Sequence, residues 1–553
     1  MLYPKMNKYR DLYSLNGIWN FSTVCDDYVP DKKNCNFMLM PVPASFNDLV
    51  TDRKLVDYLG KVLYETEFSV PVHANKLYRL RIGATSHKCD VFLNGKLIGK
   101  GINGYFPIDL PLTDLNEVNR LSIVIDNRLT FETFPTSEVK NGRQEQTFDF
   151  FNYTGIHRDV LIYTLPEKHI EDVTVKTVVG GDYKKVSVDV ETNCDSVTYT
   201  VLDKSGNVVY SGKDKDFVID NPILWDTDNP YLYTLSVQTE CDKYDLKFGI
   251  RKVQVTNKQF LLNDKPVYFK GFGLHEDFLM SGKGKNTPLN IRTFELIKWI
   301  NANSIRTSHY PYSEEIMDLA DEYGVLVIDE VPAVGMAPGC FNDGKITDNT
   351  RELHKELIKQ LFARDKNHPC VIMYSLANEP ASNEPDSLPY FEDVFAFARK
   401  IIDLPLTMVN NKDDDICLQL VDVACLNRYY SWYTDTEDLS VIKKQLSDNV
   451  KLFYEKFNKP ILLSEFGADT LEGNHTLPAD IFSEEYQTDF VKEFCDTLDE
   501  FDYCIGEHVW NFSDFKTMPC IWRVRGNRKG IFTRERQPKM AAHFFRNRWK
   551  DIK

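Results

Sequence analysis

The sequence predicts a multidomain protein of the β plus α/β class, in which two β-sandwiches precede a C-terminal (β/α)8 TIM barrel. Its 553 residues exceed the size at which a single hydrophobic core stops growing. Up to about residue 255 the chain consists of short runs with a period of two, which is typical of antiparallel sandwiches. Beyond that point strands alternate with helices, as they do in a parallel barrel.

The first domain is predicted over residues 1–168. Its alternating runs lie between about residues 12 and 165 and are separated by Asn, Gly and Pro turns: KVLYETEFSV, LYRLRIG, KCDVFLNG, RLSIVID and DVLIYTL. The Asn-Gly pair at the start of NGK, residues 94–96, follows VFL directly and indicates a tight hairpin. We therefore expect an all-β sandwich here.

The second domain is predicted over residues 169–255. The charged stretch LPEKHIED indicates that a new domain begins here. The period of two then continues in VTVKTVV, KVSVDVET, SVTYTVLD and LYTLSVQTE. About 85 residues with this pattern are typical of a small immunoglobulin-like sandwich.

The third domain is predicted over residues 256–553. It contains eight candidate strands, each followed by a helical or crossover segment: VYFKGFG, SIRTSHY, VLVIDEV, CVIMYSLANE, LTMVN, VACLNRYY, PILLSEFG and CIGEHVWNF. Eight such units in about 298 residues fit a (β/α)8 barrel, which typically needs about 250.

Composition excludes several classes of partner. With 42% hydrophobic and 27% charged residues the chain has ordinary globular usage, and its net charge of -16 disfavours nucleic acid and anionic membranes. We expect no export signal, because the N-terminus lacks an apolar run, and no membrane span. Twelve cysteines without paired spacing favour reduced thiols, a cytoplasmic location and no metal site. No cofactor is predicted.

Two glutamates end predicted barrel strands, where the chemistry of such barrels takes place. The fourth strand places Asn378 and Glu379 at the barrel mouth, and the seventh places Glu465 there, 86 positions later. Cleavage of a glycosidic bond needs a proton donor and a second carboxylate, which in retaining enzymes lie roughly 5 to 5.5 Å apart. The pair therefore indicates a sugar-cleaving enzyme.

Several short motifs, including those that contain the two glutamates, resemble motifs of one enzyme family. SLANEP at 375–380 and SEFG at 464–467 resemble the acid/base and nucleophile motifs of glycoside hydrolase family 2. FNYTGIHRDV at 151–160, GFGLHED at 271–277, RTSHYPY at 306–312 and LNRYYSWY at 426–433 are also similar to that family, most of all to its β-glucuronidases. The resemblance covers essentially the whole chain, and it implies that the first sandwich is a jelly roll.

The resemblance implies a role for each residue near the two glutamates. Glu379 would protonate the leaving group and later activate water, while Glu465 would form a covalent glycosyl-enzyme with net retention. Asn378 would bond the sugar 2-hydroxyl, and Tyr429 would hydrogen-bond the nucleophile. The remaining residues expected at the sugar are Asp149, which would reach in from the jelly roll, His275, His309, Asn427, Tyr433 and Trp510.

A basic loop after the last strand resembles the part of β-glucuronidases that recognises the sugar carboxylate. Asn527 and Lys529 in GNRKG resemble the Asn-x-Lys pair that these enzymes use, and Arg523 resembles another member of the same pocket. Buried cationic or amide donors are the physical means of selecting a uronic acid over a neutral hexose. The resemblance therefore implies a β-D-glucuronide substrate.

Several alternatives stay open on sequence alone. A galacturonide differs in one ring hydroxyl, a galactoside lacks the carboxylate, and a carbohydrate-binding protein with an inactive barrel would need no pair of strand-end glutamates. The connection at 331–350 is short beside the long insertion of some bacterial relatives, which predicts an open aglycone side that accepts small conjugates or oligosaccharides. The resemblance also implies a homo-oligomer, commonly a tetramer.

Overall fold

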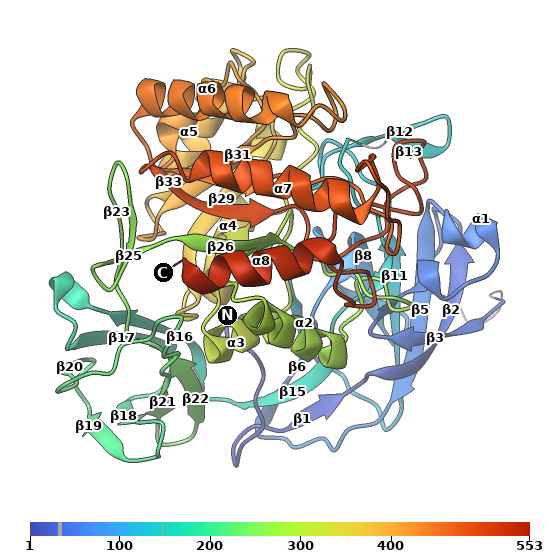
Figure 1. Ribbon diagram of the computed structural model, residues 1–553. Helices are drawn as coiled ribbons and strands as arrows, with labels where there is room; N and C mark the ends of the chain where they lie inside the picture. The colour runs from blue at the N-terminus through green and yellow to red at the C-terminus, as the bar shows by residue number, and fades with distance from the viewer. Residues whose placement is uncertain (31–35, 146, 553) are drawn as a thin grey trace.

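The computed structural model describes residues 1–30, 36–145 and 147–552 and places three domains around one barrel. In Figure 1 the first domain, in blue, stands to the right of the barrel, and the second domain, in teal and green, lies below it on the left. The helices and strands of the barrel run from green to red. The predicted order of sandwich, sandwich and barrel is therefore confirmed.

The first domain is a sandwich of two antiparallel sheets. One sheet has the order β1 (Leu12–Ser14), β15 (Val160–Pro166), β6 (Lys76–Ile82), β10 (Ile108–Leu112). The other has the order β3 (Met38–Val42), β2 (Gly17–Val24), β5 (Lys61–Phe68), β11 (Asn119–Asp126), β8 (Lys88–Leu93), β9 (Lys96–Gly101). Alternate side chains of both sheets form one apolar core, as the period of two predicts.

Short elements complete this domain. The predicted Asn-Gly hairpin joins β8 to β9, and Asn94 and Gly95 have φ values of 52° and 84°, as such a turn requires. The others are η1 (Phe46–Asp48), α1 (Arg53–Val56), a sheet of β4 (Ala44–Ser45), β14 (Gly155–Ile156) and β7 (Thr85–Ser86), and a hairpin of β12 (Glu138–Lys140) and β13 (Arg143–Glu145).

The second domain is a smaller sandwich with its own core. Its sheets have the orders β16 (Ile170–Thr177), β17 (Lys185–Thr192), β20 (Asp216–Val218) and β19 (Val208–Gly212), β18 (Thr198–Leu202), β21 (Tyr233–Gln238), β22 (Lys243–Phe248); η2 (Val179–Gly181) follows β16. The first ten residues of the chain also pack here, because Arg10 forms a buried ion pair with Asp242 at 2.5 Å and Asn7 donates to the Lys243 carbonyl.

A three-stranded meander lies between the second sandwich and the barrel: β23 (Val253–Val255), β24 (Phe260–Leu262) and β25 (Lys265–Val267). A boundary at 255/256 would cut this sheet, because β23 pairs with β24 across it. We propose that the third domain starts at about residue 252, and that residues 1–168 and 169–251 form the first two domains.

The third domain is a closed parallel barrel, and its eight strands fall within the eight predicted segments. They are β26 (Phe269–Gly273), β27 (Ser304–Arg306), β28 (Leu326–Glu330), β29 (Val371–Asn378), β30 (Leu406–Asn410), β31 (Ala424–Asn427), β32 (Ile461–Glu465) and β33 (Cys504–Val509). From β27 onward every residue of these strands is buried, which explains their continuous apolar sequences.

Helices cover the outside of the barrel: α2 (Thr287–Trp299), α3 (Glu314–Tyr323), α4 (Asp348–Asp365), α5 (Ser387–Ala398), α6 (Ser440–Phe457), α7 (Glu484–Leu498) and α8 (Met540–Asp551). Between β30 and β31 the crossover contains only the short η3 (Leu418–Leu420). Within the described ranges, none of the helices has the length and apolar character that crossing a bilayer would demand.

Candidate active site

A cavity of about 460 Å³ opens at the carboxyl ends of the barrel strands. Ten of the predicted site residues line it: Asp149, His309, Asn378, Glu379, Asn427, Tyr429, Tyr433, Glu465, Trp510 and Arg523. Three loops supply much of the remaining wall. The first domain contributes Thr147 and Phe148 from the loop before β14, the connection between β28 and α4 contributes Val334, Gly335, Ala337 and Pro338, and the loop after β30 contributes Asn411, Lys412 and Asp413. The structure thus brings both strand-end glutamates to one cavity.

Glu465 ends β32 and is buried, with 4% of its surface exposed. Its Oε1 accepts a hydrogen bond from the guanidinium of Arg306, and its Oε2 accepts one from the Tyr429 hydroxyl at 2.7 Å. The bond from Tyr429 is the one that the family resemblance implied. Both donors stabilise the ionised carboxylate and fix its orientation toward the cavity.

The pKa of Glu465 reflects competing effects. Burial raises it to about 8, because desolvation disfavours the charged form; Arg306 opposes this, and the nearby Glu379 adds to it.

We expect the acid limb of kcat/KM against pH to follow the ionisation of Glu465 and to move to lower pH in Glu379→Gln. In the nucleophilic role that the family resemblance implies for Glu465, attack requires the carboxylate, so activity is lost as the pH falls through its pKa. The charge of Glu379 raises that pKa, and a neutral glutamine lowers it. Hydrolysis of 4-nitrophenyl glucuronide from about pH 4 to about pH 9 measures the shift. Asp413→Asn, at another cavity-lining carboxylate, should leave the limb in place, and an unmoved or raised limb in Glu379→Gln contradicts the assignment.

Glu379 follows the last residue of β29 and has a left-handed φ of 47°. Its Oε1 accepts a hydrogen bond from the side-chain amide of Asn427 at 2.7 Å. The other end of that amide is fixed, because Asn427 Oδ1 accepts a bond from Ser464 at 2.9 Å. Asn427 was expected to face the sugar; in this structure it positions Glu379, and since Ser464 immediately precedes Glu465 it links the two glutamates.

Arg306 contacts Glu465, and it is not among the site residues predicted from the sequence. It ends β27, is fully buried, and binds Glu330 at 2.9 Å as well as Glu465. Its guanidinium also donates to Asn378 Oδ1 at 3.3 Å, which holds the residue expected to bond the sugar 2-hydroxyl. Its position at a strand end, within the string RTSHYPY, is the signal that could have identified it.

The two histidines occupy different positions. His309 lines the cavity, with its ring centroid 5.0 Å from that of Trp510. His275 lies outside the cavity wall, where its Nδ1 hydrogen-bonds the Tyr310 hydroxyl at 2.9 Å and its ring packs on Phe515 at 4.2 Å. Burial lowers the pKa of both rings, so both are neutral near pH 7.

The first domain contributes Asp149 to the barrel mouth, as the resemblance implied. Arg523 donates to its carboxylate at 2.9 Å and Asn527 donates to it at 2.8 Å. Arg523 also donates to the Tyr433 hydroxyl at 2.6 Å. Asp149 therefore connects two predicted members of the carboxylate pocket across a domain boundary.

Lys529 and Asn527 lie just outside the residues that line the cavity. The ammonium of Lys529 is fully buried, forms an ion pair with Asp469 and lies 4.8 Å from the ring centroid of Trp432 and 4.9 Å from that of Tyr433. Asp469, four residues after Glu465, is a second residue that the sequence reading missed. It also receives a bond from Arg523 at 3.3 Å.

Two groups of possible metal ligands occur in the described part of the chain, and neither lines this cavity. In one of them, Asp321 accepts from His368 at 2.6 Å and from the Cys370 backbone at 2.9 Å, while the Cys370 thiol donates to the Met317 carbonyl. These residues are hydrogen-bonded to one another and to nearby backbone, so we interpret the group as a structural hydrogen-bond network. The second group is considered below.

Comparison with known proteins extends these observations to the whole chain. Three models of glycosyl hydrolases family 2 match the chain. The sugar binding domain matches residues 12–166, the model described as glycosyl hydrolases family 2 matches residues 156–251, and the TIM barrel domain matches residues 253–553. The chain belongs to glycoside hydrolase family 2. The predicted family and fold class are thereby confirmed, and the chain is a glycoside hydrolase.

The most similar family members include several β-glucuronidases. The enzyme of Paenibacillus borealis is 39% identical over 100% of this chain and 99% of its own length. The solved structure of an uncultured Clostridium sp. β-glucuronidase has a TM-score of 0.97 and 43% identity, with 100% of both chains covered. Ruminococcus gnavus β-glucuronidase in complex with D-glucaro 1,5-lactone has a TM-score of 0.93 and 38% identity, with 99% of each chain covered.

Proposed function

We propose that this family 2 enzyme hydrolyses β-D-glucuronides to glucuronic acid and an aglycone, with Glu465 as nucleophile and Glu379 as acid/base. The observation that carries the proposal is that both glutamates line one cavity at the barrel mouth, each held by its own donor. Full-length similarity to proteins named β-glucuronidase supports glucuronide as the substrate. It also weighs against the galactoside, the galacturonide and the non-catalytic binding protein.

The first step breaks the glycosidic bond. Glu465 attacks the anomeric carbon and forms a covalent ester, while Glu379 gives its proton to the departing aglycone oxygen. In the second step the ionised Glu379 removes a proton from water, the water oxygen replaces Glu465, and both carboxyl groups return to their starting state with net retention. Tyr429 and Arg306 stabilise Glu465 whenever it is ionised.

Selection of the sugar carboxylate is assigned to Lys529, Asn527 and Arg523. Lys529 and Arg523 both bind Asp469, so a cluster of cationic groups adjoins the cavity with an acid already in place. A bound glucuronate would add a second carboxylate, for which the remaining donors of Lys529 and the side-chain amide of Asn527 are suited. A neutral hexose would offer no charged acceptor to the remaining N–H groups of Lys529 and Asn527, whose other N–H groups bond Asp469 and Asp149.

We expect Lys529→Met to lower kcat/KM for 4-nitrophenyl β-glucuronide by about 10- to 150-fold, because one charged hydrogen bond contributes about 1.5 to 3 kcal/mol. The matched β-glucoside, β-galactoside and β-galacturonide report on selectivity. Activity on the neutral sugars should change little, so the preference for uronides falls.

Methionine is similar to lysine in length, and Asp469 keeps its bonds from Arg523 at 3.3 Å and from the Arg528 backbone at 2.7 Å, which limits loss of folding. Lys412→Met removes another lysine of the cavity wall and serves as the matched control. If Lys529→Met reduces hydrolysis of uronides and neutral sugars equally, Lys529 does not recognise the carboxylate.

We further propose that the aglycone side accepts oligosaccharides. The connection between β28 and α4 lies against the wall of the cavity, where Val334, Gly335, Ala337 and Pro338 line it. Glu384 fixes this loop by accepting hydrogen bonds from the backbone of Phe341 and Asn342, both at 3.1 Å. A glucuronic-acid-terminated oligosaccharide should therefore give a kcat/KM above that of 4-nitrophenyl glucuronide, and equal or slower hydrolysis would contradict the proposal.

A homo-oligomer, commonly a tetramer in the family, also remains our proposal. It is supported by apolar side chains on β2 and on or beside the edge strand β3: Ile18, Phe37, Met38 and Leu39 are 64%, 44%, 40% and 73% exposed. Light scattering of the purified protein measures the mass that decides this. A cytoplasmic location is proposed as well, on the support of the free thiols of the described cysteines.

A further inference from the structure

Two cysteines meet on the second domain, well separated in sequence from the catalytic residues. Cys194 lies in the loop after β17, and Cys241 lies in the turn between β21 and β22. Each cysteine is the third residue of a Thr-x-Cys segment, in which the threonine hydroxyl accepts a hydrogen bond from the cysteine backbone. Thr192 does so at 3.1 Å and Thr239 at 3.4 Å, so both loops present their thiols in the same way.

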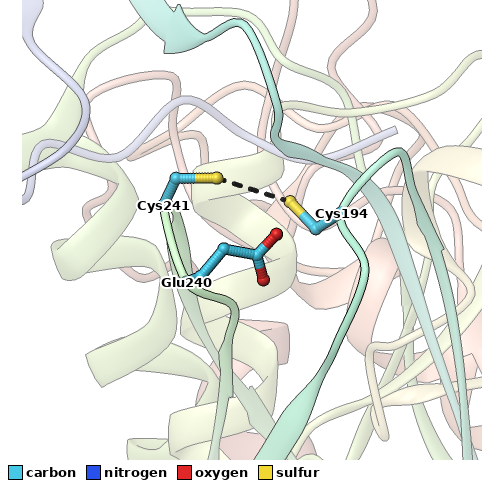
Figure 2. Close-up of side chains that lie close together, drawn as sticks. All are labelled: Cys194, Glu240 and Cys241. Atoms are coloured by element: carbon cyan, nitrogen blue, oxygen red, sulfur yellow. Dashed lines mark hydrogen bonds between the residues drawn. The ribbon is translucent and has the colours of Figure 1, made fainter.

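The separation of the two sulfur atoms is informative. Figure 2 shows the thiols directed toward one another, with their Sγ atoms 3.8 Å apart. A disulfide requires about 2.05 Å. Two thiolates that bind one tetrahedral zinc ion, each about 2.3 Å from the metal, lie about 3.8 Å apart. The two thiols form a weak S–H···S hydrogen bond, and the same spacing is the one that two thiolate ligands of a single zinc ion require.

A third ligand lies beside the thiols. The carboxylate of Glu240 shares the region between the two cysteine side chains in Figure 2, and one ligand atom of each of the three residues lies within 4.8 Å of the others. The backbone N–H of Asp195 donates to Glu240 Oε1 at 3.2 Å, which holds the carboxylate close to Cys194. Both cysteines are partly exposed and Glu240 is exposed, so an ion can enter from solvent.

We propose that Cys194, Cys241 and Glu240 bind one zinc ion, or a similar thiophilic divalent cation, with water as the fourth ligand. Thiolates and carboxylates are both zinc ligands, and three protein ligands with one water complete a tetrahedral site of the open type. Binding releases the thiol protons to solvent and forms two metal–sulfur bonds without any change of oxidation state.

The site lies at a junction between domains. As a thiol, Cys241 donates to the Lys168 carbonyl at 3.3 Å, and Lys168 follows β15, the last strand of the first domain. On deprotonation Cys241 exchanges this bond for a metal–sulfur bond. The site thus joins two loops of the second domain next to the linker that enters it. The sequence indicated no metal site because 47 residues separate the two cysteines and no C-x-x-C pair marks them.

Titration of the reduced, metal-free full-length protein with Co²⁺ tests the proposal. We expect one equivalent of Co²⁺ to give a thiolate-to-cobalt charge-transfer band in the near ultraviolet, together with visible bands of a tetrahedral ion. One equivalent of Zn²⁺ should remove both sets of bands. Cys194→Ser/Cys241→Ser should abolish the bands, and Glu240→Gln should weaken binding at least about tenfold. Cys25→Ser, at an exposed thiol of the first domain, is the matched control and should bind as the wild type does.

A second measurement uses the unaltered chain, in case the double variant does not fold. Zinc should protect Cys194 and Cys241 from alkylation, whereas Cys25 and Cys520 should be alkylated as readily as without zinc. Peptide mass spectrometry identifies the alkylated cysteines. The proposal is overturned if no charge-transfer band develops, if the double variant keeps it, or if the two thiols form a disulfide and take up no metal. Hydrolysis of glucuronides should be the same with and without zinc, so the result is independent of the proposed function.

Discussion

Glu465→Ala is expected to lower kcat for glucuronide hydrolysis by about 10⁴-fold or more, because no other described carboxylate of the cavity occupies its position. The variant should still fold. Arg306 keeps its bonds to Glu330 at 2.9 Å, so the substitution leaves no buried cation without a partner. Thermal unfolding, measured beside activity, separates loss of catalysis from loss of structure.

The product formed with azide distinguishes the nucleophile from other essential residues. In Glu465→Ala the small anion can occupy the space of the missing carboxylate and attack the same face of the sugar, which gives an α-glucuronyl azide of inverted configuration. Nuclear magnetic resonance of the product identifies the configuration. Activity near that of the wild type would refute the assignment, and so would a β-azide.

Glu379→Gln is expected to affect substrates according to their leaving groups. General acid catalysis contributes about 10²- to 10⁴-fold, and an alkyl aglycone needs it most. We therefore expect kcat/KM for methyl glucuronide to fall by about 10³-fold or more. The loss on 4-nitrophenyl glucuronide, whose leaving group departs without a proton, should be smaller by a factor of at least about ten.

The second step provides an independent check of Glu379. Without its base, the glycosyl-enzyme should accumulate and release nitrophenol in a burst. In Glu379→Ala azide should restore turnover and give the β-azide, the opposite configuration to that from Glu465→Ala. Asp413→Asn is the control at another cavity-lining acid, and equal losses on both substrates would argue against the acid/base role.

The sequence predicted the parts of the fold that follow from local periodicity. All eight barrel strands and the Asn-Gly hairpin at Asn94 were identifiable, because buried parallel strands and tight turns restrict residue choice along a short segment. The packing of residues 1–10 against the second domain could not be predicted, because it depends on the ion pair of Arg10 with Asp242, 232 positions away.

For the site, residues inside recognisable strings could be placed, and residues that act through a partner could not. Arg306 and Asp469 are ordinary charged residues until the barrel closes and sets them beside Glu465 and Lys529. His275 shows the reverse case: its string resembled the family, yet the ring packs outside the cavity wall. Distance in three dimensions decides these roles, and periodicity contains no information about it.

The bond between Asp149 and Arg523 has a consequence for how such a protein changes over generations. The two residues lie 374 positions apart and in different domains, yet they share one pocket wall. A domain exchange that places a different residue at position 149 would remove this bond from the cavity wall. We therefore expect the β-sandwich and the barrel to have changed together at this contact.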